Sequence, residues 1–216
     1  MIELDIPISD AAAQREGVRA AIIAAVEEME LMITFEASLS KYPWSTHWHI
    51  RRPVTVEAGP KRISILPSDR FLLTCDVFYE HPLIGQQSLD MEVTPERYAE
   101  EIAPARTFGF SYELDQMRNM GLIRGAALDN AICFNRRGVD NPDGLRFVDE
   151  CCRHKALDLI GDLALIGKPL LGHVIAERAG HAMHTALVAR IMSDPSLYEI
   201  LSFDQLATRV AHALVS

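Results

Sequence analysis

No stretch of the 216-residue sequence is apolar over a length that could cross a bilayer. The most hydrophobic segment, residues 18–35, is interrupted by Glu27, Glu28 and Glu30. Residues 1–5 contain two acids and no base, whereas a secretory signal begins with a basic segment. We therefore expect a protein with no integral membrane segment and with a cytoplasmic location.

Basic charge is also scarce. The chain has 21 Lys and Arg against 30 Asp and Glu, which gives a formal net charge of −9 at pH 7. No general positive field then attracts the phosphates of a nucleic acid or an anionic membrane surface. The sequence therefore predicts no nucleic-acid partner, and any anionic ligand must be held by a few local cations.

Cysteine is rare and follows no recognisable spacing. The four residues Cys75, Cys133, Cys151 and Cys152 contain no C-x-x-C pair, which speaks against a disulfide framework and against a cysteine zinc site. The neighbours Cys151 and Cys152 would point in different directions on a helix. We expect reduced thiols packed in the interior.

The hydrophobic pattern predicts an α+β domain, a two-layer sandwich in which a mainly antiparallel sheet packs on helices. Short β-branched runs between turn residues over 48–79 are typical of an antiparallel meander, and residues 170–176 of a buried strand. Amphipathic spacing and capping signals predict helices over residues 14–31, 94–104, 147–166 and 180–192. The other expected segments are an extended stretch over 2–8, a helix-and-strand unit over 112–134 and a loop over 136–144.

The helix predicted over 147–166 has two different faces. His154, Asp158 and Asp162 stack at i, i+4 and i+8, with Lys155 alongside, so that an imidazole and a carboxylate could converge on one cation. A solvated polar face with a helical His–Asp pair is the competing interpretation. The apolar arc opposite consists of Val148, Cys152, Ala156, Leu159, Ile160 and Leu163.

Three further features could carry chemistry or be structural. His181 opens a helix directly after a strand, which suits an acid–base histidine or a capping residue at the surface. Segment 106–110 mixes a hydroxyl with two aromatic rings around a glycine, and could contact a ligand; the pattern alone favours a packed corner. His47 and His49 share one face of a strand, as surface residues or as two ligands.

Several short motifs occur together in a fixed order and spacing, at residues 105–110, 121–122, 128–131, 143–147, 149–150, 153–155, 158, 160–162 and 180–181. On these motifs the chain resembles the family of UDP-3-O-acyl-N-acetylglucosamine deacetylase, a two-domain zinc enzyme of lipid A biosynthesis. The resemblance is to the C-terminal half of that enzyme alone. It implies that residues 1–13 are a remnant strand of the first domain with its lead-in, and that 14–216 form one domain with a βα insert at about 111–135.

The resemblance also implies roles for single residues. His154 and Asp158 become two of three zinc ligands, and His181 the catalytic histidine that stabilises the oxyanion and protonates the leaving amine. Asp162 would orient His181, and Thr107 would contact the reacting acetyl group.

The same comparison implies contacts with the substrate, a UDP-linked acylated amino sugar. Lys155 would contact its anionic nucleotide end and Phe108 its sugar–nucleotide side. The expected lining of the passage for the fatty acyl chain is Leu114, Ile123, Leu128, Ala131 and Cys133.

Departures from the family pattern qualify these roles. The Thr-x-x-Glu-His type of helix that supplies the third ligand and the general base has no counterpart here, so Glu150 and Glu177 are candidate replacement bases. Local differences fall at residues 125–127, 178–179 and 184–185. We expect weak zinc binding, slow or absent hydrolysis by this chain alone, and a homodimer or a separate first-domain partner.

The alternative function is a non-catalytic or regulatory domain that binds a UDP-sugar, a lipid precursor or another protein.

Overall fold

The computed structural model describes residues 46–112, 130–202, 204–206 and 208–209, all of which belong to one compact unit, Thr46–Ser216. The strand expected over 2–8, the helix over 14–31 and most of the 111–135 insert lie outside the described residues. The proposed boundary at residue 13 therefore stays a prediction. Within the described part of the chain, no helix is both long and apolar enough to cross a membrane.

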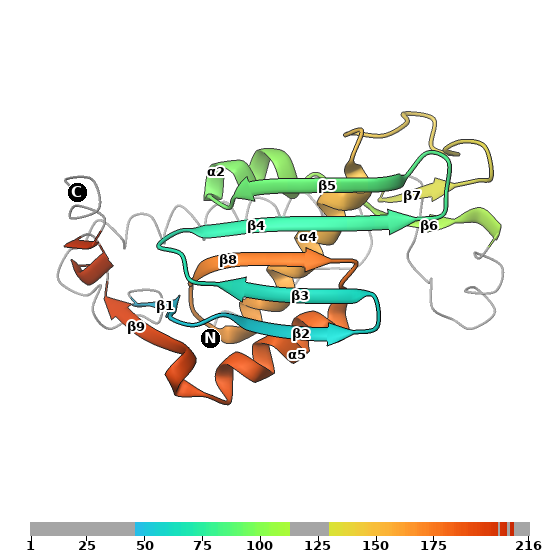
Figure 1. Ribbon diagram of the computed structural model, residues 1–216. Coiled ribbons are helices and arrows are strands. Elements are labelled where there is room, and N and C mark those ends of the chain that lie inside the picture. The colour runs from blue at the N-terminus through green and yellow to red at the C-terminus, as the bar shows by residue number, and fades with distance from the viewer. Residues whose placement is uncertain (1–45, 113–129, 203, 207, 210–216) are drawn as a thin grey trace, which may run out of the picture. The chain divides into compact units, whose positions relative to one another are not determined.

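The architecture is α+β, with a mostly antiparallel sheet, as the sequence predicts (Figure 1). The strands of the large sheet are β1 (Thr46–Ile50), β2 (Val54–Ala58), β3 (Lys61–Leu66), β4 (Phe71–Tyr79), β5 (Gly85–Glu92), β8 (Leu170–Glu177) and β9 (Tyr198–Ser202). A second, two-stranded parallel sheet contains β6 (Thr107–Phe110) and β7 (Ala131–Phe134). The helices are α2 (Pro95–Arg97), the π-helix η3 (Tyr98–Ile102), α4 (Glu150–Leu163), η4 (Ala164–Ile166), α5 (His181–Met192) and η5 (Pro195–Leu197).

The late strand β8 is the centre of the large sheet. It runs antiparallel to β3 and parallel to β4, so that Ile65 and Leu73 both pair with Val174. The predicted antiparallel meander over 48–79 is therefore wrong between β3 and β4. It is also wrong between β1 and β2, since β1 pairs with β8 and β9. The physical reason is burial: the apolar run of β8 needs strands on both edges, which a hairpin between β3 and β4 would deny it.

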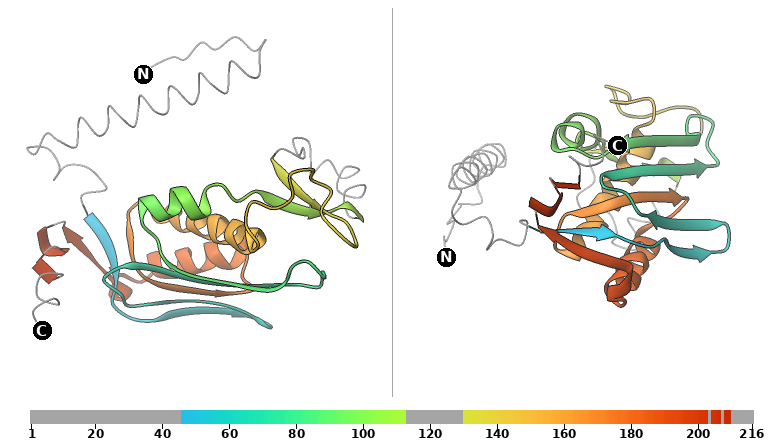
Figure 2. Two further views of the ribbon diagram at one scale, coloured as in Figure 1. Left: turned by 90° about the horizontal axis from the view of Figure 1, so that it is seen from above. Right: turned by 60° about the vertical axis from the view of Figure 1, so that its left-hand side comes forward.

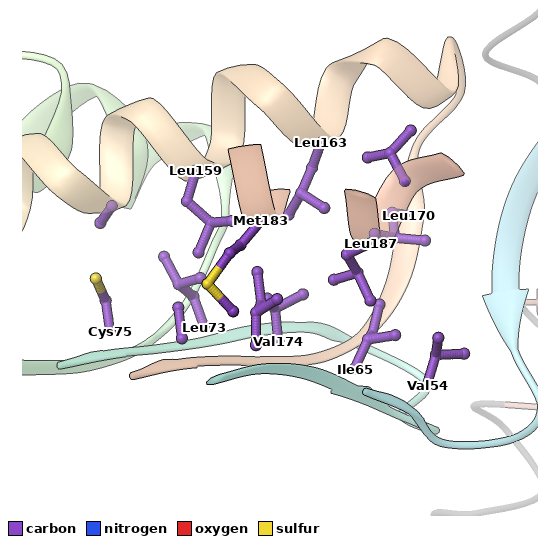
Figure 3. Close-up of a cluster of buried hydrophobic side chains, with 14 of the residues drawn as sticks. Val54, Ile65, Leu73, Cys75, Leu159, Leu163, Leu170, Val174, Met183 and Leu187 are labelled. Atoms are coloured by element: carbon purple, nitrogen blue, oxygen red, sulfur yellow. The ribbon is translucent and has the colours of Figure 1, made fainter. Parts of the chain in front are cut away.

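Helices α4 and α5 cover one face of this sheet (Figures 1 and 2). Leu159 of α4 and Leu187 of α5 are fully buried and point toward Val174 and its neighbours in the sheet (Figure 3). The two long helices thus keep their polar arcs away from the sheet.

The cysteines are reduced. Cys75, Cys151 and Cys152 are buried free thiols, as expected, while the thiol of Cys133 is partly exposed.

Helix α4 begins later than predicted, at Glu150 rather than at residue 147. Val148 lies in the preceding turn and is 91% exposed, so its assignment to the apolar arc is wrong. Cys152, Ala156, Leu159 and Leu163 are buried as predicted, whereas Ile160 is half-buried.

Replacing two glycines by alanine should change the stability of the fold in opposite directions. A Cβ on Gly172 would lie 2.9 Å from Ile65 Cδ1 and 3.2 Å from Ile50 Cγ1, whereas a Cβ on Gly161 of α4 meets nothing within 4 Å. We expect Gly172→Ala to lower the free energy of unfolding by about 1–3 kcal/mol through overpacking. The matched control, Gly161→Ala, should raise it by about 0.5–1 kcal/mol because alanine favours the helix. Urea denaturation checks both, and a Gly172→Ala variant as stable as the control would contradict the packing.

Candidate active site

His154 and Asp158 lie side by side on the polar arc of α4. The Nδ1 atom of His154 is 3.3 Å from the carbonyl oxygen of Ala105, which can only accept, so Nδ1 carries the proton. The other ring nitrogen, Nε2, faces Asp158, 3.5 Å from its Oδ1 atom. Histidines that bind a metal through Nε2 commonly donate their Nδ1–H to a backbone carbonyl in this way.

Lys155 modulates the charge of this pair. Its ammonium donates to Asp158 Oδ2 at 2.7 Å and also lies 5.8 Å from the centre of the Phe108 ring. Phe108 in turn contacts the His154 ring edge to face, with ring centres 6.3 Å apart. The structure thus brings together four predicted site residues from α4 and β6.

His181 joins this group from the start of α5. The preceding strand β8 ends at Glu177 and Gly180 is the N-cap residue, as the sequence predicts. The Nδ1 atom of His181 donates to Asp162 Oδ2 at 2.7 Å, which places Nε2 on the side of Asp158, 3.7 Å from its Oδ2 atom. The side chain of His181 is 65% exposed, so Nε2 is accessible from solvent.

His184 was not singled out as a site residue by the sequence, yet it is the buried member of the cluster. It is 1% exposed and its Nδ1 atom lies 2.8 Å from the same Asp162 Oδ2 atom. Burial lowers the pKa of His184, although Asp162 opposes this shift, so the ring is a neutral donor at pH 7. Asp162, His181 and His184 have ligand atoms within 4.8 Å of one another, close enough to hold a metal ion. The i, i+3 spacing from His181 was the available signal.

Segment 106–110 is not the packed corner that its pattern favours, since Thr107–Phe110 form the extended strand β6. Phe108 and Phe110 are drawn inward by an aromatic cluster with Phe134 of β7. Thr107 is exposed and lies opposite Ala131, while Cys133 lies opposite Gly109.

Strand alternation puts Thr107, Ala131 and Cys133 on the face away from the aromatic cluster. The Cys133 thiol lies 3.3 Å from an Asp140 carboxylate oxygen. Leu114, Ile123 and Leu128, the other expected lining residues, lie outside the described residues.

A buried ion pair joins Arg106, the residue directly before β6, to the first turn of α4. The Glu150 carboxylate, with no exposed surface, accepts from the Arg106 guanidinium at 2.9 and 3.2 Å. It also accepts from the backbone N–H groups of Arg106 and Arg146 at 3.1 and 2.6 Å. Burial alone would raise the pKa of Glu150, but these hydrogen bonds from Arg106 and Arg146 hold it below its usual value.

Both carboxylates suggested as a replacement base are excluded by position. Glu150 is fully committed to Arg106 and the backbone, one turn before His154. Glu177 is the last residue of β8 and follows Ala176, which is buried in the core between the sheet and the helices. Because side chains alternate along a strand, the Glu177 side chain faces the opposite side of the sheet. Neither carboxylate can reach the group around Asp158.

The predicted surface position of His49 is also wrong. His49 is buried, and its ring nitrogens lie 2.9 Å from Glu199 Oε1 and 3.1 Å from Asp69 Oδ1. Because both nitrogens already face carboxylates, His49 offers no free ligand atom for a two-histidine site with His47.

The donor set of α4 fits a divalent metal ion. His154 Nε2 and the Asp158 carboxylate are a nitrogen and an oxygen ligand of the kinds that zinc accepts, and the carbonyl of Ala105 fixes the tautomer that binding requires. Two such ligands on one helix make an incomplete site, because a catalytic zinc takes three protein ligands and water.

The sequence matches a known protein family. The sequence profile described as "UDP-3-O-acyl N-acetylglycosamine deacetylase" matches residues 6–193. The chain belongs to this family. It is 72% identical over 167 residues to the UDP-3-O-acyl-N-acetylglucosamine deacetylase of Solibacter usitatus, an alignment that covers 77% of this chain and 56% of the relative.

Two less similar relatives also align with this chain over about half of their own length. The deacetylases of Myxococcus xanthus and Syntrophotalea carbinolica are 47% and 44% identical over 152 and 159 residues. These alignments cover 70% and 74% of this chain but 48% and 52% of the relatives. This member of the deacetylase family thus spans about half the length of the curated relatives it matches.

Proposed function

We propose that this chain supplies the C-terminal half of a zinc-dependent deacetylase site, which removes the N-acetyl group of a UDP-linked, 3-O-acylated glucosamine in lipid A biosynthesis. The observation that carries the proposal is the convergence of His154 Nε2, the Asp158 carboxylate and His181 Nε2 on one side of the helix layer. The names of the relatives support the choice of substrate class. We also propose a cytoplasmic location for this reaction.

His154 and Asp158 would hold the metal. A bound zinc ion polarises an amide carbonyl and lowers the pKa of its water to about 7. Lys155 shares the Asp158 carboxylate with this position, which limits the negative charge that the pair presents.

His181 would act on the reacting group itself. Its Nδ1–H is held by Asp162, so a protonated ring directs its second N–H from Nε2 toward the Asp158 side. There it would stabilise the tetrahedral oxyanion and pass the proton to the leaving amine. Thr107, at the start of β6, would contact the acetyl group.

The remaining predicted contacts concern binding. Lys155 would contact the nucleotide end of the substrate and Phe108 its sugar–nucleotide side, and the Lys155 ammonium lies over the Phe108 ring. We assign the acyl passage to Leu114, Ile123, Leu128, Ala131 and Cys133. We propose that the third ligand and the base come from outside the residues that the structure describes, with a homodimer partner or a separate first-domain chain as the expected sources.

Hydrolysis measured beside a full-length relative tests this proposal. We expect the zinc-loaded chain to bind the UDP-linked substrate but to release acetate about 10²–10⁴-fold more slowly than the Solibacter usitatus enzyme, since general-base assistance contributes that factor. Calorimetric titration and acetate release provide the two measurements. A chain that does not bind the substrate would contradict the proposed function. Acetate release as fast as that of the relative would contradict the inference that the chain lacks a general base.

One observation favours the alternative of a non-catalytic or regulatory binding domain: Glu150 is locked in an ion pair and Glu177 faces the wrong side of the sheet. This alternative predicts substrate binding with no acetate release, and binding that is unchanged in His181→Ala. The deacetylase proposal predicts a residual rate that His181→Ala abolishes.

A further inference from the structure

His184 is a buried polar residue whose ring contacts the predicted partner of the catalytic histidine. The ring is 1% exposed and lies in the buried row of α5, between Met183 and Leu187. Its Nδ1 atom is 2.8 Å from Asp162 Oδ2. A buried imidazole loses its rotational freedom to packing, so this contact fixes the carboxylate.

Asp162 needs such a fixed partner. Its side chain is 19% exposed, and its second partner, His181, is 65% exposed and therefore free to exchange the carboxylate for water. The two imidazole rings meet edge to face, with centres 6.0 Å apart, and both Nδ1 atoms reach the same oxygen. The buried ring thus fixes the acceptor to which the exposed ring binds.

We propose that His184 is a positioning residue, which holds the Asp162 carboxylate through its Nδ1–H and thereby sets the direction in which His181 presents Nε2. The proposal rests on the proposed function for the role of His181 in the reaction. The neutral, buried state of His184 supports it, because an ionised carboxylate can accept from Nδ1 only if that atom carries the proton.

A metal ion between Asp162, His181 and His184 is the competing explanation of the cluster. Ligand atoms bound to one tetrahedral zinc at about 2.0–2.1 Å lie about 3.3 Å apart. The separations of 2.7 and 2.8 Å between the two Nδ1 atoms and Asp162 Oδ2 are instead ordinary hydrogen-bond lengths.

Histidine-ring NMR of the intact, metal-free chain tests the proposal without any hydrolysis. At pH 8 we expect His181 and His184 to carry their protons on Nδ1. In His184→Leu, the ratio of Nδ1–H to Nε2–H forms of His181 should fall about fivefold, the worth of one hydrogen bond. His184→Asn should preserve the ratio, because its amide nitrogen occupies nearly the position of Nδ1; His184→Met repeats the loss if the Leu variant does not fold.

The matched control is His173→Asn, since His173 binds Thr74 on the other face of the sheet. An unchanged His181 ratio in both His184→Leu and His184→Met would overturn the proposal, as would zinc that displaces the Nδ1 protons of His181 and His184. Because no arm measures turnover, a chain that fails to bind the UDP-linked substrate would refute the proposed function and leave these results interpretable.

Discussion

Replacing Glu150 by Gln should cost about 3–5 kcal/mol of folding free energy, because it leaves the Arg106 guanidinium buried without its counter-charge. For a domain of this size, that corresponds to a fall in Tm of about 6–20 °C. The loss also has a pH signature. The pKa of Glu150 is held below its usual value, so its stabilisation is complete above about pH 4.3, the ordinary pKa, and is lost as the pH falls further.

Thermal unfolding of the wild-type and variant chains at pH 7 measures this effect. Glu92→Gln is the matched control, because the Arg70–Glu92 pair is exposed and should contribute at most about 1 kcal/mol. A Glu150→Gln variant no less stable than Glu92→Gln would show that the buried pair does not anchor β6 to α4.

Replacing His154 by Ala should weaken zinc binding by at least about 100-fold, since losing even an outer partner of a metal ligand costs about 10–100-fold. Of the described residues, the expected site uses His154 and Asp158, and α4 carries no second histidine that could compensate for the loss. Zinc titration with a competing chelator measures the affinity. The wild-type chain itself should bind more weakly than a site with three protein ligands.

His173→Ala controls for a general loss of histidine, because His173 lies on the open face of the sheet with Thr74. Equal zinc affinities of His154→Ala and the wild-type chain would refute the assignment to α4. A wild-type site that resists strong chelators would show that further ligands complete it.

Local sequence patterns predicted the parts of the site that belong to one element. The i, i+4, i+8 spacing on α4 put His154, Asp158 and Asp162 on one arc, and Gly180 before His181 marked the start of α5. The α+β class followed from the same periodicities. Each of these inferences needs only the geometry of a single helix or strand.

Patterns that depend on contacts between distant segments could not be predicted in this way. The insertion of β8 between β3 and β4 joins residues about a hundred positions apart, so runs over 48–79 alone suggested a meander. Glu150 was predicted as a candidate replacement base, because Arg106, the partner that occupies its carboxylate, precedes it by 44 residues. In the sequence, His184 was a local difference from the family pattern, and its contact with Asp162 could be seen only in the folded chain.

Zinc binding at His154 and Asp158 is tested most directly by a zinc anomalous difference map from crystals of the zinc-loaded chain. We expect one peak within about 2.0–2.2 Å of His154 Nε2 and an Asp158 oxygen, the usual zinc bond lengths, with His181 hydrogen-bonded to Asp162 beside it. A peak between Asp162, His181 and His184, or no peak near His154, would contradict this assignment.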